Sequence, residues 1–126
     1  MKKLFLSTLI VILSSVSAQA SKGSENLVNK SIATREISTF CKMIRSGNYE
    51  NVKALINNGT DINRKSLGLT PLMYAARYNR VDILKLLIKK GARLSTKSKQ
   101  GHTALDYAKM SKATEAYDII KNSLEK

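Results

Sequence analysis

The sequence predicts an all-α fold built as a solenoid, in which short helix–turn–helix units stack on one another and are joined by hairpin-like loops. The first observation is one stretch, residues 68–92, which holds two apolar helical segments separated by a tight turn and followed by a glycine. The second is that parts of this stretch recur at steps of 32 or 33 residues. A unit of this length cannot bury both of its faces alone, so copies must stack to form a core.

The central unit carries signals for where each helix begins and ends. Thr70 can cap the first helix with its side-chain oxygen, and Pro71 suits the first turn, where its missing N–H costs nothing. Asn79 tolerates the left-handed conformation that a tight turn between helices often needs. Gly91 follows the second apolar run, where a helix C-terminus favours a residue with positive φ. We therefore predict helix, turn, helix and glycine stop in this stretch.

The same signals return on both sides of the central unit. Four of its residues recur 33 positions later, pairing Gly68 with Gly101, Thr70 with Thr103, Leu72 with Leu105 and Ala75 with Ala108. Residues 47–63 align with residues 79–95 at a step of 32. We predict three repeats, over about residues 35–64, 65–97 and 98–126. The outer two have atypical sequences, as expected of the capping units of a solenoid.

This pattern resembles the ankyrin repeat family. The elements GxTPLxxAA, VxILKLL and GA follow one another in residues 68–92 in the family's order and spacing. The resemblance spans roughly residues 37–124, and it implies stacked helix pairs with a concave binding surface. Met73 and Asp106 stand where the family usually has a histidine that hydrogen-bonds the adjoining loop.

The outer repeats carry weaker signals for their helices. In the first repeat we expect a helix over about residues 34–45, with four residues on its inward side: Ile37, Phe40, Cys41 and Ile44. In the last repeat we expect a helix over about residues 113–124, whose apolar side includes Leu124. Cys41 is the only cysteine and cannot form an internal disulfide. It is either a small buried hydrophobe or a free thiol that pairs with a partner.

The N-terminus has the three regions of a secretory signal peptide. A basic start is followed by an apolar stretch over residues 4–13 and by Ala18-Gln19-Ala20, which matches a cleavage site. The apolar stretch is shorter than the ~20 residues that span a bilayer. We predict a signal peptide over residues 1–20, a polar linker over 21–34 and a repeat domain over 35–126. We therefore expect the chain to be exported, and to have no stable membrane span after the signal is cleaved. In a bacterium, the exported chain would be periplasmic or secreted.

The chain is strongly basic, with a formal net charge of +13. Between Asp82 and Asp106 there is no acidic residue, whereas several lysines fall in this interval. Such a field attracts anionic partners, which include envelope polymers, lipid headgroups and acidic proteins. The alternative is a solvated surface that reflects biased composition. Nucleic acid is disfavoured, because the sequence has neither a motif that places a helix in a groove nor an aromatic platform for bases.

The sequence predicts no catalysis, no cofactor and no metal. His102 is the only histidine, and no carboxylate or cysteine stands at ligand spacing from it. No G-x-S-x-G, HExxH, P-loop or CxxC motif is present.

The function predicted is that of an exported protein–protein interaction module, and the alternative is a basic surface that binds anionic envelope components or acidic proteins. The ankyrin resemblance implies contact positions on the fingers and on the adjoining helices. In this sequence they are Ser66, Leu67, Leu69, Arg77, Tyr78, Lys97, Lys99, Gln100, His102, Met110 and Ser111. Arg45 and Ser46 are weaker counterparts in the first repeat. The partner itself is not named by the sequence.

Overall fold

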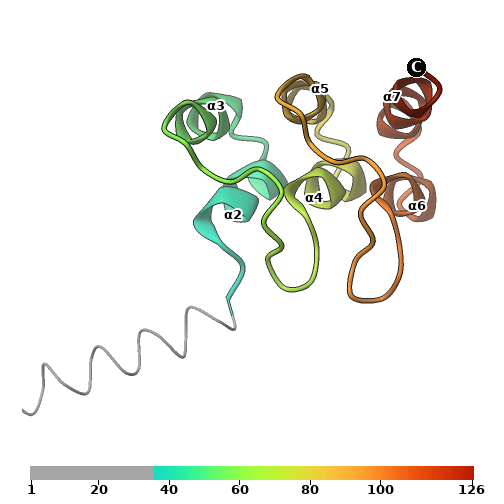
Figure 1. Cartoon of the computed structure of the whole chain (residues 1–126), viewed down its shortest axis with the longest axis horizontal. Helices are drawn as coiled ribbons and strands as arrows, with labels where there is room; N and C mark the ends of the chain where they lie inside the picture. Colours follow the sequence, from blue (N-terminus) through green and yellow to red (C-terminus); the bar gives the residue numbers. More distant parts are fainter. Residues whose placement is uncertain (1–35) are drawn as a thin grey trace, which may run out of the picture. The chain divides into compact units, whose positions relative to one another are not determined.

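The computed structural model describes residues 36–126, and this part of the chain is all α-helical, as predicted (Figure 1). Its six helices are α2 (Thr39–Ser46), α3 (Tyr49–Asn57), α4 (Pro71–Arg77), α5 (Val81–Lys89), α6 (Ala104–Met110) and α7 (Thr114–Leu124). Within these residues the β-structure is one isolated bridge between Ser66 and Leu69. The predicted signal peptide and linker, residues 1–34, lie outside the described residues.

The helices form two rows that follow the repeat (Figure 1). The first helix of each unit, α2, α4 or α6, belongs to the inner row, and the second, α3, α5 or α7, belongs to the outer row. Two loops project from the inner row: the first finger, residues 63–69, and the second finger, residues 95–102. The helix pairs therefore stack in the order that the 33-residue period predicts.

The core lies between the rows and between successive units. Small residues of the inner row are fully buried, among them Ala75 and Ala76 in α4 and Ala108 in α6. They let the inner helices approach one another closely. In the outer row, larger side chains such as Leu84 and Leu87 have no exposed surface. Leu84 therefore belongs to the core that the outer row shares with the rest of the stack.

Each inner helix ends in the same left-handed turn. A residue one or two positions after the helix has positive φ in all three units: 80° at Gly47, 53° at Asn79 and 57° at Lys112. In each unit the next amide donates to a carbonyl five residues back, as at Arg80 N to Ala75 O, 2.8 Å. The prediction for Asn79 is confirmed. Lys112 adopts the same conformation although its residue type does not favour it.

Side chains also link successive repeats. The Asn79 Oδ1 atom accepts from the Ala116 N–H at 3.3 Å, and it thereby caps α7, which has no capping side chain of its own. The Arg80 Nε–H donates to the Arg45 carbonyl at 2.9 Å. The Arg93 N–H donates to Asn63 Oδ1, also at 2.9 Å. These bonds fix how each unit is rotated on the one before it.

Two predicted details of the outer repeats are wrong. Helix α2 begins at Thr39 rather than near Thr34, because the Ser38 hydroxyl caps it by accepting from the Cys41 N–H at 3.2 Å. Leu124 does not belong to the core and is 43% exposed. In the repeat register Leu124 corresponds to Gly91, which lies just beyond the end of α5, so the last turn of α7 extends past the packed part of the row.

Candidate partner-binding surface

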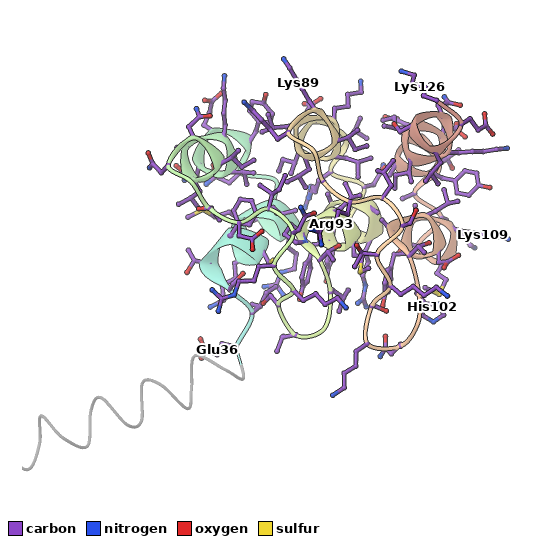
Figure 2. All side chains as sticks on the ribbon, in the orientation of Figure 1. Glu36, Lys89, Arg93, His102, Lys109 and Lys126 are labelled. Atoms are coloured by element: carbon purple, nitrogen blue, oxygen red, sulfur yellow. The ribbon has the colours of Figure 1, made fainter. Side chains whose placement is uncertain are left out.

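The predicted contact positions fall on the two fingers and on the C-terminal ends of the inner helices. Figure 2 shows His102 on the finger side of the stack and Lys89 on the opposite, outer side. Eight of the eleven predicted residues are exposed, and His102 is half-exposed; the eight are Leu67, Arg77, Tyr78, Lys97, Lys99, Gln100, Met110 and Ser111. Arg45 and Ser46, their counterparts in the first repeat, are exposed as well.

Exposed apolar side chains are concentrated at these positions. Four large hydrophobic residues are exposed in the described part of the chain: Leu67, Tyr78, Met110 and Leu124. Three of the four are predicted contact residues, with exposed fractions of 54% for Leu67, 38% for Tyr78 and 54% for Met110. Solubility alone would favour polar residues there, so this distribution supports a contact role for the surface.

The other two predicted residues belong to the frame of the first finger. Ser66 is buried, and its hydroxyl accepts from the Ser38 N–H at 2.7 Å. Leu69 is half-buried and packs against the core. Of the two finger leucines, Leu69 therefore packs locally and Leu67 projects into solvent. Ser66 was chosen by its position in the repeat, which does not reveal that its side chain bonds to the preceding unit.

The tip of the first finger is held in an unusual conformation. Leu67 has a φ of 52° and Gly68 a φ of 81°, and the Ser66–Leu69 bridge closes the turn. The Lys99 N–H donates to the Gly68 carbonyl at 3.1 Å, which joins the two fingers. A Cβ atom at Gly68 would lie 2.9 Å from the Lys99 Cβ, so only glycine fits this approach. Leu67, by contrast, is a bulky residue in a backbone region that costs roughly 1–2 kcal/mol.

A hollow of about 370 Å³ lies where the second finger meets the ends of α4 and α6. We call it the Arg77 hollow, and its lining consists of Arg77, Gln100, His102, Tyr107, Met110 and Ser111. The structure therefore brings together five predicted contact residues. Leu67, Tyr78, Lys97 and Lys99 are not part of the lining.

Tyr107 also lines the hollow, although it is not among the predicted contact residues. Its hydroxyl is hydrogen-bonded to the Ser98 hydroxyl at 2.9 Å and to Gln100 Oε1 at 3.1 Å, and its ring makes an edge contact with the His102 ring. The equivalent Tyr74 hydroxyl donates to the Ser66 carbonyl at 2.8 Å. The repeated tyrosine thus ties each finger to its inner helix. Recurrence of Tyr at a step of 33, beside a loop without the usual histidine, was the signal available for this role.

The capping residues at the start of the inner helices also differ from the family pattern without loosening the loops. The Asp106 carboxylate accepts from the Thr103 N–H at 2.9 Å, while the Thr103 hydroxyl accepts from the Asp106 N–H. These hydrogen bonds lower the pKa of the Asp106 carboxyl. In the central unit, the Met73 sulfur takes the place of the carboxylate beside the Thr70 N–H.

A second cluster of basic residues lies over the outer row, on the other side of the molecule from the fingers. A groove of about 510 Å³ between α3 and α5 is lined by Tyr49, Lys53, Asp82, Lys85, Leu86, Lys89 and Lys90. We call it the lysine groove. It contains four ammonium groups and one carboxylate, and Lys89 extends outward from it (Figure 2). The two candidate surfaces are therefore separate.

Three further possibilities raised by the sequence were a reactive cysteine, a metal site and a membrane-spanning helix. Cys41 is 1% exposed, and burial raises the pKa of its thiol. It packs as a core residue. Residues 36–126 contain no group of three His, Cys, Asp or Glu side chains that could hold a metal ion. None of the helices in the described range is long and apolar enough to cross a bilayer.

Comparison with known proteins agrees with the architecture. A family model described as ankyrin repeats (3 copies) matches residues 40–124, which is more than half of the chain. The chain therefore belongs to the ankyrin repeat family. Ankyrin repeats are protein–protein interaction modules, and they are typically not enzymes.

Individual relatives share this part with otherwise different proteins. Over 68 residues the chain is 38% identical to human M-phase phosphoprotein 8, covering 52% of this chain and 8% of the relative. A putative ankyrin repeat protein of Rickettsia bellii is 34% identical over 89 residues, covering 65% of this chain and 53% of the relative. The E3 ubiquitin-protein ligase hecd-1 of Caenorhabditis elegans is 35% identical over 79 residues, covering 63% of this chain and 3% of the relative. The chain spans only a fraction of each relative's length, about half at most.

Proposed function

We propose that the protein is exported and binds a protein partner through the finger side of its repeat stack. The observation that carries this proposal is the exposure of three large apolar side chains, Leu67 on the first finger and Tyr78 and Met110 at the ends of two inner helices. Interface residues whose truncation costs most are enriched in tyrosine and arginine, and Tyr78 adjoins Arg77 there. The side chain of Arg77 lies 5.8 Å from the Tyr78 ring centroid, so the pair forms one mixed polar and apolar contact.

The test compares two double variants against one partner. A photo-crosslinking residue placed at Tyr78, in cells that make the protein, should trap a partner, and the same residue at Lys89 should not. The Arg77→Ala/Tyr78→Ala variant should then bind the trapped partner more weakly by about 2 kcal/mol or more if the two residues form a hot spot. Its circular dichroism spectrum and melting temperature should stay close to those of the parent, because both side chains are exposed.

The matched control is Lys89→Ala/Lys90→Ala, on the outer row. We expect a small effect from this pair, because it lies in the lysine groove and away from the finger side. The opposite ranking would contradict the proposal: the Lys89→Ala/Lys90→Ala variant would bind the partner more weakly, and the Arg77→Ala/Tyr78→Ala variant would bind it nearly as well as the parent. It would favour the second candidate function, attachment of the lysine groove to anionic envelope components or acidic proteins.

Salt provides an independent discrimination between the two candidates. Attraction through exposed lysines is screened, since the Debye length falls from about 10 Å at 0.1 M to about 3 Å at 1 M ionic strength. Docking that depends mainly on apolar side chains on the finger side should weaken much less over the same range. Four lysines in one groove are the observation that favours the charged candidate.

Export is proposed from the signal-peptide pattern, and it has its own test. If the Ala18-Gln19-Ala20 site is cleaved, the mature chain begins at Ser21. Mass spectrometry of the protein recovered outside the cytoplasm should show this N-terminus. A chain that still begins with Met1 would contradict cleavage and favour an anchored protein.

A further inference from the structure

The Arg77 guanidinium has unused hydrogen-bonding capacity. Within residues 36–126 its one side-chain interaction is with the ring of the adjacent residue, Tyr78. Arg80, three residues further on, donates its Nε–H to the Arg45 carbonyl and is structural. Arginine presents five N–H donors in a planar fork that matches a carboxylate. Arg77 therefore presents its donors at the lining of the hollow.

No acidic residue lines this hollow. Asp106 is on the same helix as Met110, but its carboxylate accepts from the Thr103 N–H and caps α6. In the lysine groove, by comparison, Asp82 supplies a carboxylate among the lysines. The positive charge of Arg77 is thus left for a group from outside the described residues.

The rest of the lining provides further donors and an apolar wall. The Gln100 amide oxygen is hydrogen-bonded to the Tyr107 hydroxyl, which orients the amide so that its NH₂ group remains a donor. The Ser111 hydroxyl and the His102 ring add polar atoms to the lining, while Met110 is 54% exposed and contributes an apolar side. A carboxylate on a short aliphatic stem fits this combination of donors and apolar surface.

The position of Arg77 at the end of α4 does not by itself account for the hollow. A cation in the last turn complements the helix dipole, and α2 and α6 have Arg45 and Lys109 in their last turns. In the repeat register, however, Arg77 corresponds to Met110, so the third unit places an apolar side chain where the second places a guanidinium. Both residues line the hollow, Arg77 from the second unit and Met110 from the third.

We infer that the Arg77 hollow receives a glutamate or aspartate side chain of the protein partner, held by Arg77 and by the Gln100 amide. This inference rests on the proposed interaction function and adds the chemistry of the partner's anchoring residue. Charge-assisted bonds of this kind are about twice as strong as neutral ones and are specific in geometry.

The test uses two pools of blocked hexapeptides that differ at one position, which is Glu in one pool and Gln in the other. The remaining positions are uncharged. Each pool is titrated into the full ¹⁵N-labelled chain, and the Arg77 Nε–H, Gln100 side-chain and Ser111 amide resonances are followed by NMR. The Glu pool should bind about tenfold more tightly, the order expected for hydrogen bonds to a charged rather than a neutral group. The shifts should be confined to the hollow.

Variants of Arg77 test whether the preference for Glu depends on the positive charge alone or also on the geometry of the guanidinium. Arg77→Gln should remove the preference for Glu, and Arg77→Lys should restore only part of it, because an ammonium cannot form the paired bonds of a guanidinium. The Lys89→Ala/Lys90→Ala variant removes charge from the outer row and should leave the preference intact. An unchanged amide spectrum of each free variant verifies that it is folded.

Three results would overturn the inference: equal binding of the two pools, no binding of either, or Glu-dependent shifts at Lys85 and Lys89 instead of the hollow. Failure here is distinguishable from failure of the proposed function. If Tyr78 still cross-links to a partner while the pools bind equally, the interaction surface stands and the acidic anchor does not.

Discussion

The inner and outer rows of helices come from the same repeat, yet they are specified in different ways. The inner helices have their own capping side chains, namely Ser38 for α2, Thr70 for α4 and Thr103 for α6. In the outer row, Asn48 caps α3, but the N-cap residues of α5 and α7, Arg80 and Ala113, provide no side-chain cap. The inner row is therefore fixed largely by local bonds, whereas α5 and α7 depend more on contacts with their neighbours.

This difference extends to the two candidate surfaces. The residues around the Arg77 hollow are held by short-range bonds, such as those from the Tyr107 hydroxyl to Ser98 and Gln100. The lysine groove is formed by long ammonium side chains, each a flexible and strongly hydrated point charge. We conclude that the finger side is suited to selecting a partner by shape and hydrogen bonding. The lysine groove is suited to attracting a partner by charge.

The largest effect should come from removing the burial that holds the outer row. Leu84 in α5 has no exposed surface, and Leu84→Ala should lower the free energy of unfolding by about 2–5 kcal/mol through lost transfer energy and the cavity left behind. Urea denaturation followed by circular dichroism measures this. Because small domains have roughly 5–15 kcal/mol in total, the variant should unfold at a clearly lower urea concentration.

Leu124→Ala is the matched control in the same row. Leu124 is 43% exposed in the last turn of α7, so this substitution should change stability by no more than about 0.5 kcal/mol. Similar losses from the two variants would show that burial does not distinguish these positions, and the assignment of Leu84 to the core would be wrong.

The sequence predicted those helix starts and turns that depend on the preferences of residues close together in the chain. Thr70 as a cap, Pro71 in the first turn, and the left-handed turns at Asn79 and Gly91 all reflect preferences of single residues in their local sequence, and the structure has them as predicted. The period of 33 then fixed the order of the units. Residues 34–45 were less well placed, because Ser38 was not recognised as the cap that starts α2.

What the sequence did not predict depends on contacts between units. The Asn79 side chain caps a helix 37 residues away, and Arg80 reaches a carbonyl 35 residues away. No local preference encodes such pairs. The contact positions were inferred from the repeat register, which located the finger side but did not separate the buried Ser66 from the exposed Leu67. Tyr107 was omitted because its regular recurrence resembles that of a packing residue.

The next largest effect should come from removing a cap in the inner row. The Thr103 hydroxyl accepts from the Asp106 N–H at 3.3 Å, and Thr103→Ala should cost about 1 kcal/mol, as for other N-cap replacements. Thr114→Ala, at the exposed first residue of α7, should stay within about 0.5 kcal/mol. Melting temperatures of the two variants measure the contrast. Equal shifts would mean that the inner row gains nothing from its local caps.

A smaller effect should appear on acidification. The pKa of the Asp106 carboxyl is lowered in the folded chain by its hydrogen bonds to Thr103. The ionised form therefore stabilises the fold at pH values above the unfolded pKa, and this stabilisation is lost as the pH falls through the lower, folded pKa. Denaturation of the parent and of Asp106→Asn between pH 7 and pH 2 should show a difference that shrinks toward acid pH. A difference that does not change with pH would exclude the charge of Asp106 as its source.

The last expected change in stability is a gain, and it concerns the two bulky residues with positive φ on the exposed surface, Leu67 and Lys112. Asparagine visits this conformation at lower cost, so Leu67→Asn and Lys112→Asn should each stabilise the fold by up to about 1 kcal/mol. Only Leu67 is a predicted contact residue. If its strained conformation is retained for binding, Leu67→Asn should raise the melting temperature while it weakens capture of the cross-linked partner, whereas Lys112→Asn should raise it with binding unchanged. Equal binding by both variants would remove Leu67 from the contact surface, and its 54% exposed side chain would then have no role at the finger tip.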